Sequence, residues 1–468
     1  MDLSRVTHAS ASDIATAVRR REITAVAVMR AFLDRIERLE PRLNTFATLT
    51  ADAALQAAHH VDKLIAGARD PGPLAGVPVS VKDLIAVGGV RQAFGSRLLA
   101  ANVAPHDTPS VERLRHAGAC IVGKSTTSEF GAKAVGDSPL TGITRNPWSL
   151  ERTAGGSSAG AAAQVAARMV PLALATDGGG SIRIPASFCG VFGIKARFGR
   201  VPVWPAATAP ALAHIGPITH NVRDAALVLS VIGGRDARDE SSLRLPVPDF
   251  LAGLGVGIRG MRIGWCPSFG YGSADAEVVE ACQQAALQLE AEGARVTTIA
   301  PPFARDPAPA WNHLFYGRIG ERLAELAPTA ERLHLVDPAL RQAVAEQQGA
   351  GPPREAELAA LLEETRARAE AMFRTVDVLL TPTVPVTALP VGIDIPPGHG
   401  GTNAVDWSCF TYPFNLTGHP AASFPVGLDR QGLPIGLQIV GSLDGEGAIL
   451  RVAGALERLR PIAPPQLA

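Results

Sequence analysis

The sequence predicts an α/β protein with a large mixed, mostly parallel central sheet that helices cover on both faces. Short apolar runs rich in β-branched residues alternate with segments of helical periodicity, which is the pattern of parallel strands joined by helical crossovers. The chain has 468 residues, of which 47% are hydrophobic and 19% charged, so it can bury a sizeable core. Because no repeat or low-complexity linker divides it, we expect a single domain over residues 1–468.

The expected elements fall into three parts along the chain. Residues 10–66 have apolar positions at helical spacing and predict N-terminal helices. Strands and helices alternate from about residue 73 to 235, where we expect the catalytic core. A further β-α-β unit follows, and residues 311–374 predict a helical insertion that caps the site. The apolar runs "VDVLLTPTVP" and "IGLQIVG" predict strands that return to the sheet.

Composition narrows the class of function. The net charge is zero, which gives no electrostatic support for nucleic-acid binding, and no apolar run is long enough to predict a membrane span. The N-terminal segment lacks the apolar core of a secretion signal, and the five scattered cysteines contain no CxxC pair. We therefore expect a cytoplasmic protein that acts on a small-molecule substrate, without nucleic-acid or membrane partners. Homodimerisation is left open.

Two short motifs match known sites but lack the context that those sites require. "GACIVGKS" (118–125) fits a phosphate-binding loop, yet the residues between its glycines look like the strand itself. "GSSAG" (156–160) fits a nucleophile elbow with Ser158 as the nucleophile. The polar segment before it predicts no strand, and no histidine stands out as the base. We therefore favour neither interpretation.

The segment "LALATDGGGSIRIPAS" (172–187) predicts an acyl-transfer site. Its apolar run predicts a buried strand, and three glycines and Ser181 follow that strand directly. Consecutive backbone N–H groups without side chains, beside a serine hydroxyl, combine an oxyanion hole with a nucleophile. A glycine-rich turn with a capping serine is the structural alternative.

Two other residues are candidates for the base of this site. Ser157 opens an Ala-rich segment that predicts a helix, which returns the chain to the same edge of the sheet; a helix N-cap is the alternative role. Lys82 follows an alternating apolar run in "GVPVSVKDLIA" and is one of only five lysines among 44 basic residues. Burial lowers the pKa of a lysine, and the neutral amine can then accept a proton. A surface lysine, or an ion pair with Asp83, is the alternative.

Taken together, four stretches resemble the amidase signature family, and the resemblance covers nearly the whole chain. The stretches are "GVPVSVKD", "NPWSLERTAGGSSAG", "ATDGGGSIRIPAS" and "PFNLTGHPAASFPVGLDRQGLPIGLQIVG". The resemblance implies a Ser–cis-Ser–Lys triad with the nucleophile at Ser181, the bridging cis serine at Ser157 and the lysine at Lys82. Amide hydrolysis through an acyl-enzyme then requires no metal or other cofactor.

The resemblance also implies which residues surround the triad. Asp177 and Arg183 match positions where we expect an ion pair that braces the loop. Gly131 and Trp407 are predicted to bind substrate, whereas Phe410 is expected in the core, as is Tyr412. The oxyanion-hole amides map onto Gly178, Gly179, Gly180 and Ser181.

The substrate is less defined by the sequence than the triad. We expect an amidase for linear amides, with esters and aryl carbamates (urethanes) as further candidates. Residues 125–130 read "STTSEF", without the Asn-Met of the "TNMDEF" usual in the glutamine-hydrolysing subunit of tRNA-dependent amidotransferases. This difference favours a stand-alone hydrolase. That subunit, or a non-catalytic scaffold subunit, is the alternative.

Overall fold

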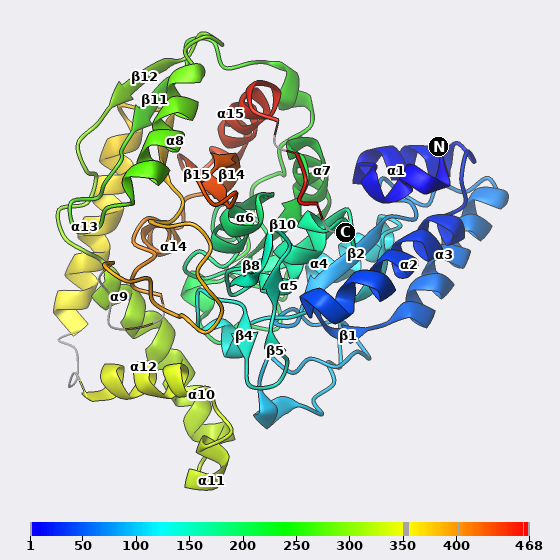
Figure 1. Ribbon diagram of the computed structural model, residues 1–468, viewed down its shortest axis with the longest axis horizontal. Coiled ribbons are helices and arrows are strands. Elements are labelled where there is room, and N and C mark those ends of the chain that lie inside the picture. The colour runs from blue at the N-terminus through cyan, green and yellow to red at the C-terminus, as the bar shows by residue number, and fades with distance from the viewer. Residues whose placement is uncertain (1, 350–354, 400–402, 404, 462, 467–468) are drawn as a thin grey trace.

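The computed structural model describes residues 2–349, 355–399, 403, 405–461 and 463–466 (Figure 1). An 11-stranded sheet runs through the molecule. In spatial order its strands are β1 (Phe46–Leu49), β3 (Cys120–Ser125), β2 (Pro78–Lys82), β8 (Leu172–Asp177), β10 (His214–Thr219), β9 (Phe192–Lys195), β14 (Ala421–Leu428), β15 (Pro434–Gly441), β13 (Val378–Pro382), β11 (Arg262–Trp265) and β12 (Arg295–Thr298). Two small two-stranded sheets pair β4 (Asp137–Ser138) with β5 (Gly142–Ile143) and β6 (Arg145–Asn146) with β7 (Ser149–Thr153).

Helices occupy most of the remaining chain, and the N-terminal ones match their prediction. The helices are α1 (Ala11–Arg19), α2 (Ala25–Leu43), α3 (Ala51–Ala66), α4 (Pro109–His116), α5 (Ala159–Ala166), α6 (Arg183–Cys189), α7 (Val222–Ile232), α8 (Ala276–Gln288), α9 (Ala308–Asn312), α10 (Arg318–Leu326), α11 (Ala330–Leu333), α12 (Pro338–Gly349), α13 (Glu355–Phe373), α14 (Pro413–Leu416) and α15 (Glu446–Leu459). The helical segment expected over 311–374 corresponds to α9–α13, and its residues 350–354 lie outside the described ones.

The α/β class and the mixed sheet are confirmed, but parallel pairing is less extensive than expected. Among the described strands, four of the ten pairings in the large sheet are parallel: β2 with β3 and β8, and β11 with β12 and β13. The middle of the sheet is antiparallel. There β14 and β15 form a hairpin, a connection that needs no crossover helix and so leaves no helical segment in the sequence.

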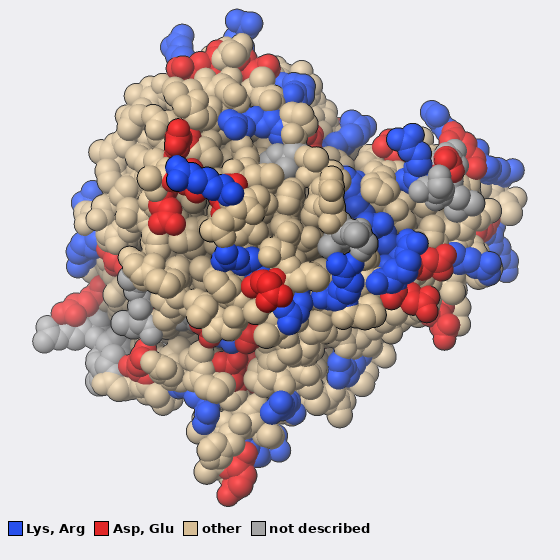
Figure 2. Space-filling view, in the orientation of Figure 1, with Lys and Arg blue, Asp and Glu red and all other residues tan. Residues whose placement is uncertain are grey.

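Both faces of the sheet are buried, because successive residues of its strands belong to different hydrophobic clusters. In β13, Val378 and Leu380 pack in the large core, whereas Leu379 packs in a second cluster. Residues of α9–α13 fill this second cluster, so the helical segment covers that face next to the site. In Figure 1 this segment lies at the opposite end of the molecule from α1–α3. Acidic and basic side chains are interspersed over the face seen in Figure 2.

Candidate active site

The glycine loop lies where the sequence predicts it, directly after a buried strand. β8 ends at Asp177, and α6 begins two residues after Ser181. Gly180 has a φ of +129°, and a Cβ at this position would lie 2.5 Å from Thr411 Oγ1. Only glycine therefore fits there without strain. The loop is held close to a segment more than two hundred residues later in the chain.

The three residues of the predicted triad meet in one hydrogen-bonded chain. Lys82 is the last residue of β2, which runs parallel to β8, so both strands end at the same edge of the sheet. Lys82 Nζ donates to Ser157 Oγ at 2.7 Å, and Ser157 Oγ donates to Ser181 Oγ at 2.9 Å. The Gly156–Ser157 peptide bond is cis. Ser181 is partly exposed, whereas Ser157 and Lys82 are buried.

Lys82 lies in an environment that favours a neutral amine. Its side chain is completely buried, and this burial lowers its pKa well below the ordinary value of 10.5, although Asp177 acts in the opposite direction. Lys82 forms no ion pair with any residue that the structure describes. Asp83, the alternative partner in the sequence, instead pairs with Lys124 at 3.3 Å.

The predicted oxyanion-hole residues are not equivalent in the structure. The Gly180 amide donates to Asp177 Oδ1 at 2.8 Å, so it is already engaged and cannot be counted as a free donor. The amides of Gly178, Gly179 and Ser181 have no acceptor within the described part of the chain. The geometry thus leaves three of the four predicted amides available to a substrate oxygen.

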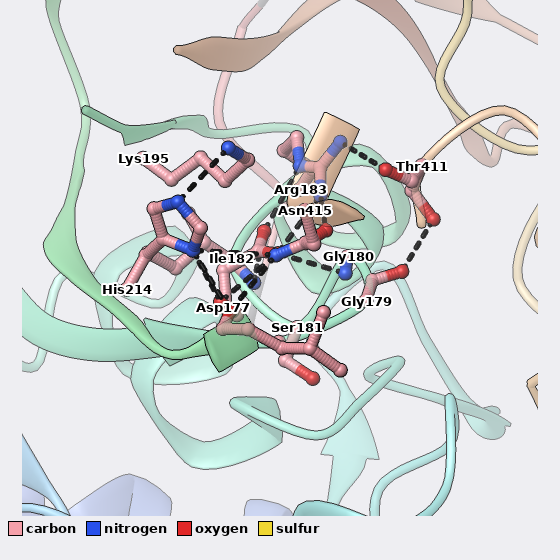
Figure 3. Close-up of polar contacts among 12 residues, drawn as sticks. Asp177, Gly179, Gly180, Ser181, Ile182, Arg183, Lys195, His214, Thr411 and Asn415 are labelled. Atoms are coloured by element: carbon pink, nitrogen blue, oxygen red, sulfur yellow. Dashed lines mark hydrogen bonds and ion pairs between the residues drawn. The ribbon is translucent and has the colours of Figure 1, made fainter. Parts of the chain in front are cut away.

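A buried ion pair braces the loop (Figure 3). Arg183 is completely buried and donates to both carboxylate oxygens of Asp177, at 2.8 and 2.9 Å. Although burial acts to raise the pKa of Asp177, Arg183 lowers it below the ordinary range. Asn415 Nδ2 donates to the backbone oxygen of Asp177 at 3.0 Å. His214 accompanies this network, and burial lowers its pKa to about 3, which keeps the ring neutral.

A cavity of about 460 Å³ opens beside Ser181 and Ser157. Gly131 lines it, and a Cβ at Gly131 would lie 3.1 Å from Ser157 Oγ. The glycine therefore keeps space next to the bridging serine. Most of the wall is apolar and includes Leu84, Phe94, Leu99, Phe130, Phe315 and Ile319.

The structure does not support Trp407 as a substrate-binding residue. Trp407 is 2% exposed, stacks on Phe188 and donates from Nε1 to the Asp394 carbonyl at 3.0 Å. It does not line the cavity beside Ser181. Its neighbours Phe410 and Tyr412 are buried in the second hydrophobic cluster, as expected.

The two motif matches set aside in the sequence have structural roles. Residues 120–125 of the phosphate-loop match form strand β3. Before Ser158 there is a strand, β7, contrary to our expectation, but it pairs only with the short β6 and not with the large sheet. Ser158 Oγ donates to the Thr176 carbonyl at 3.1 Å and is buried. Ser158 therefore supports the loop from the side.

Sequence reasoning missed the residues that hold the loop from the C-terminal half of the chain. Trp311 Nε1 donates to the Gly178 carbonyl at 2.8 Å, and Thr411 Oγ1 donates to the Gly179 carbonyl at 2.6 Å. Trp311 begins the predicted helical insertion, and Thr411 lies within "DWSCFTYPF". Neither position carries a local pattern that indicates which backbone oxygen it contacts.

Comparison with known proteins identifies the family. The Amidase family model matches residues 27–450. A glutamyl-tRNA(Gln) amidotransferase subunit of Thermosynechococcus vestitus is 36% identical over 94% of this chain and 96% of its own length. A bacterial aryl acylamidase of the amidase signature family superposes with a TM-score of 0.91, at 30% identity over 97% of this chain and 96% of that one. The amidotransferase subunit of the same name from Thermotoga maritima superposes with a TM-score of 0.78, at 28% identity over 100% and 98% of the two chains.

The predicted partners are wrong. We expected a small-molecule substrate and no nucleic acid, whereas the curated relatives carry a name that joins a tRNA to an enzyme subunit. Zero net charge argues only against attraction between the whole chain and a polyanion, and it cannot test for partner subunits. The same relatives favour our alternative function over the stand-alone hydrolase.

The comparisons agree on the family, although their names differ in activity. Within the part of the chain that the structure describes, no helix is long and apolar enough to cross a bilayer. The family match spans most of the sequence, and the curated relatives exceed 30% identity over nearly its full length. The chain belongs to the amidase family, that of the amidase signature enzymes.

Proposed function

We propose that this protein hydrolyses amides through an acyl-enzyme on Ser181, with Lys82 as the base and Ser157 as the proton relay. One observation carries the proposal: a completely buried lysine without an ion-pair partner, within hydrogen-bond distance of one serine that contacts a second, partly exposed serine. A scaffold subunit has no use for such a buried amine, because burying a polar group costs free energy.

The proposed reaction follows the chain of three side chains. Neutral Lys82 accepts the proton of Ser157 while Ser157 accepts that of Ser181, and Ser181 Oγ bonds to the substrate carbonyl carbon. Hydroxyl hydrogens rotate freely, so the 2.7 and 2.9 Å contacts serve transfer in either direction. The relay then returns the proton to the leaving nitrogen as the C–N bond breaks. Water releases the acyl group by the same steps.

The free loop amides stabilise the negative oxygen that forms during the attack. We assign this role to Gly178, Gly179 and Ser181, because the Gly180 amide already donates to Asp177. Fixed donors aimed at a developing charge lower the barrier, and losing one donor of this kind costs about 100- to 1,000-fold in kcat.

Two classes of amide are candidates, and a different observation favours each. The curated relatives favour the side-chain amide of glutamine, hydrolysed within a tRNA-dependent amidotransferase. The cavity favours amides, esters or aryl carbamates with apolar groups. Its charged lining residues are already paired, Asp177 with Arg183 and Arg322 with Glu325. The charged amino and carboxyl groups of glutamine therefore find no unpaired counter-charge among the described lining residues.

A fluorophosphonate probe followed by peptide mapping tests the nucleophile. We expect one adduct, on Ser181, that is lost in Lys82→Ala and retained in the matched control Ser158→Ala. An adduct on Ser158, or a folded wild-type protein that takes no probe, overturns the proposal. Ammonia release from glutamine and aniline release from 4-nitroacetanilide then separate the two substrate classes. The location that we propose is the cytoplasm, because all five cysteines are free and buried.

A further inference from the structure

Each peptide of the glycine loop is held by a donor outside it. The bonds join Asn415 Nδ2 to the Asp177 carbonyl at 3.0 Å, Trp311 Nε1 to the Gly178 carbonyl at 2.8 Å, Thr411 Oγ1 to the Gly179 carbonyl at 2.6 Å and the Ile184 amide to the Gly180 carbonyl at 2.7 Å. Figure 3 shows the Thr411 contact with Gly179 and the Asn415 contacts with Asp177. The whole loop is therefore oriented through its carbonyl oxygens.

A bond to a carbonyl also fixes the amide that follows it. A trans peptide is planar, and its C=O and N–H point in opposite directions. Trp311 holds the Gly178 carbonyl, so it determines where the Gly179 N–H points. That N–H has no acceptor among the described residues. By contrast, the peptide held by Thr411 carries the Gly180 N–H, which already donates to Asp177.

We propose that Trp311 is a positioning residue for the oxyanion hole, whose indole N–H orients the Gly179 amide toward the substrate oxygen. This inference rests on the proposed function. It also makes the helical segment part of the catalytic apparatus, because Trp311 belongs to α9. A bond to a carbonyl further polarises its peptide, which strengthens the N–H as a donor.

The surroundings of Trp311 suit this role. The side chain is 1% exposed, and its ring stacks on Phe315 at 4.6 Å between centroids with an interplanar angle of 18°. A Cβ at Gly179 would lie 2.6 Å from the indole, so the two groups are in direct contact. An indole N–H only donates, so the direction of its bond to Gly178 is fixed. Phe315 also lines the cavity, which links the wall of the substrate pocket to the hole.

Trp311→Phe is the first test, since it keeps an aromatic ring and removes the N–H. We expect kcat to fall about 10- to 100-fold, less than the loss of a donor itself, with KM changed by less than about threefold. The substrate is whichever of 4-nitroacetanilide and glutamine the wild-type enzyme hydrolyses. Phenylboronic acid, whose adduct on a serine places a negative oxygen in the hole, is expected to bind about tenfold more weakly. A purely structural role for Trp311 would not produce this loss of kcat and of adduct affinity at constant KM.

The matched control is Trp148→Phe. Trp148 Nε1 donates to the Cys189 carbonyl at 2.8 Å, so the control loses the same kind of bond outside the site, and kcat should not change. If Trp311→Phe unfolds, benzothienylalanine at this position keeps the shape of the indole and replaces its N–H by sulfur. Unchanged kcat in either folded variant of an active enzyme overturns the inference alone. A wild-type protein that is inert toward the fluorophosphonate and both substrates overturns the proposed function and this inference with it.

Discussion

Two buried lysines lie side by side in this molecule and differ in their partners. Lys82 ends β2, and Lys124 lies in the neighbouring parallel strand β3, in register with Val81. Both side chains are completely buried. Lys124 Nζ pairs with Asp83 at 3.3 Å, whereas Lys82 Nζ contacts the hydroxyl of Ser157. Residue type and burial are therefore the same, and only the group opposite the amine differs.

The difference teaches how one sheet edge supports two roles for lysine. Burial lowers the pKa of both side chains, but for Lys124 the adjacent carboxylate of Asp83 opposes the shift. Asp83 is itself held away from Lys82, because its Oδ2 accepts from the Ala93 amide at 3.0 Å. We conclude that Lys124 is charged and structural, and that Lys82 is the amine suited to accept a proton.

The largest effect is expected for Lys82→Arg. Arginine keeps a positive charge but cannot lose its proton in a protein, so the relay has no base. We expect kcat to fall by at least about 1,000-fold while the fold is kept, as for loss of a base in other catalytic triads. Steady-state kinetics together with circular dichroism measure this. A variant that keeps kcat within tenfold of the wild type contradicts the role of Lys82.

The next effect is on stability and concerns the other lysine. Lys124→Met leaves the buried carboxylate of Asp83 without its counter-charge, so the free energy of unfolding should fall by about 3–5 kcal/mol. Urea denaturation measures the loss. The double variant Lys124→Met/Asp83→Leu removes both charges and should recover part of it. Equal stability of Lys124→Met and the wild type would show that the pair contributes nothing.

A smaller effect is the pH dependence that separates the two lysines. The neutral form of Lys82 is the base, so kcat/KM should rise with pH as this side chain loses its proton. Burial lowers the pKa of Lys82, so the plateau should be reached well below pH 10.5. Lys124→Met should keep the same limb, provided that the assay stays within its stable range. A limb at the ordinary pH for lysine, or one displaced by Lys124→Met, would contradict the comparison.

The smallest effect is expected at an exposed lysine. Lys63 lies on α3 with its side chain in solvent, so Lys63→Arg should change the free energy of unfolding by less than about 0.5 kcal/mol. Its kcat should equal that of the wild type. Thermal unfolding and the amide assay measure both quantities. A clear loss at Lys63 would mean that arginine substitution is harmful for reasons unrelated to burial.

Part of the fold could be predicted because its signals are local. Helical periodicity identifies α1–α3, and the apolar run before the glycines identifies β8. The short β1 was missed, since its four residues are partly exposed and gain their role by pairing with β3. The antiparallel middle of the sheet was missed because strand order and direction depend on contacts between distant segments.

The candidate site divides in the same way. The triad was found through motifs that stand for a family, and the structure brings Lys82, Ser157 and Ser181 together. The substrate-binding role expected for Trp407 failed, because an aromatic residue near the motifs can point into the core as easily as into a pocket. Trp311 was missed because its contact with the Gly178 carbonyl joins segments more than a hundred residues apart.

The sequence by itself determined the class of fold, the family and the three residues of the triad, because each is written in a local pattern or a shared motif. Only the tertiary structure decided which buried lysine lacks a carboxylate, which glycine amides are free and which tryptophan touches the loop. The physical reason is that these properties depend on distances between segments remote in the chain. Burial and hydrogen-bond partners, which set a pKa or aim an amide, exist only after those segments have packed together.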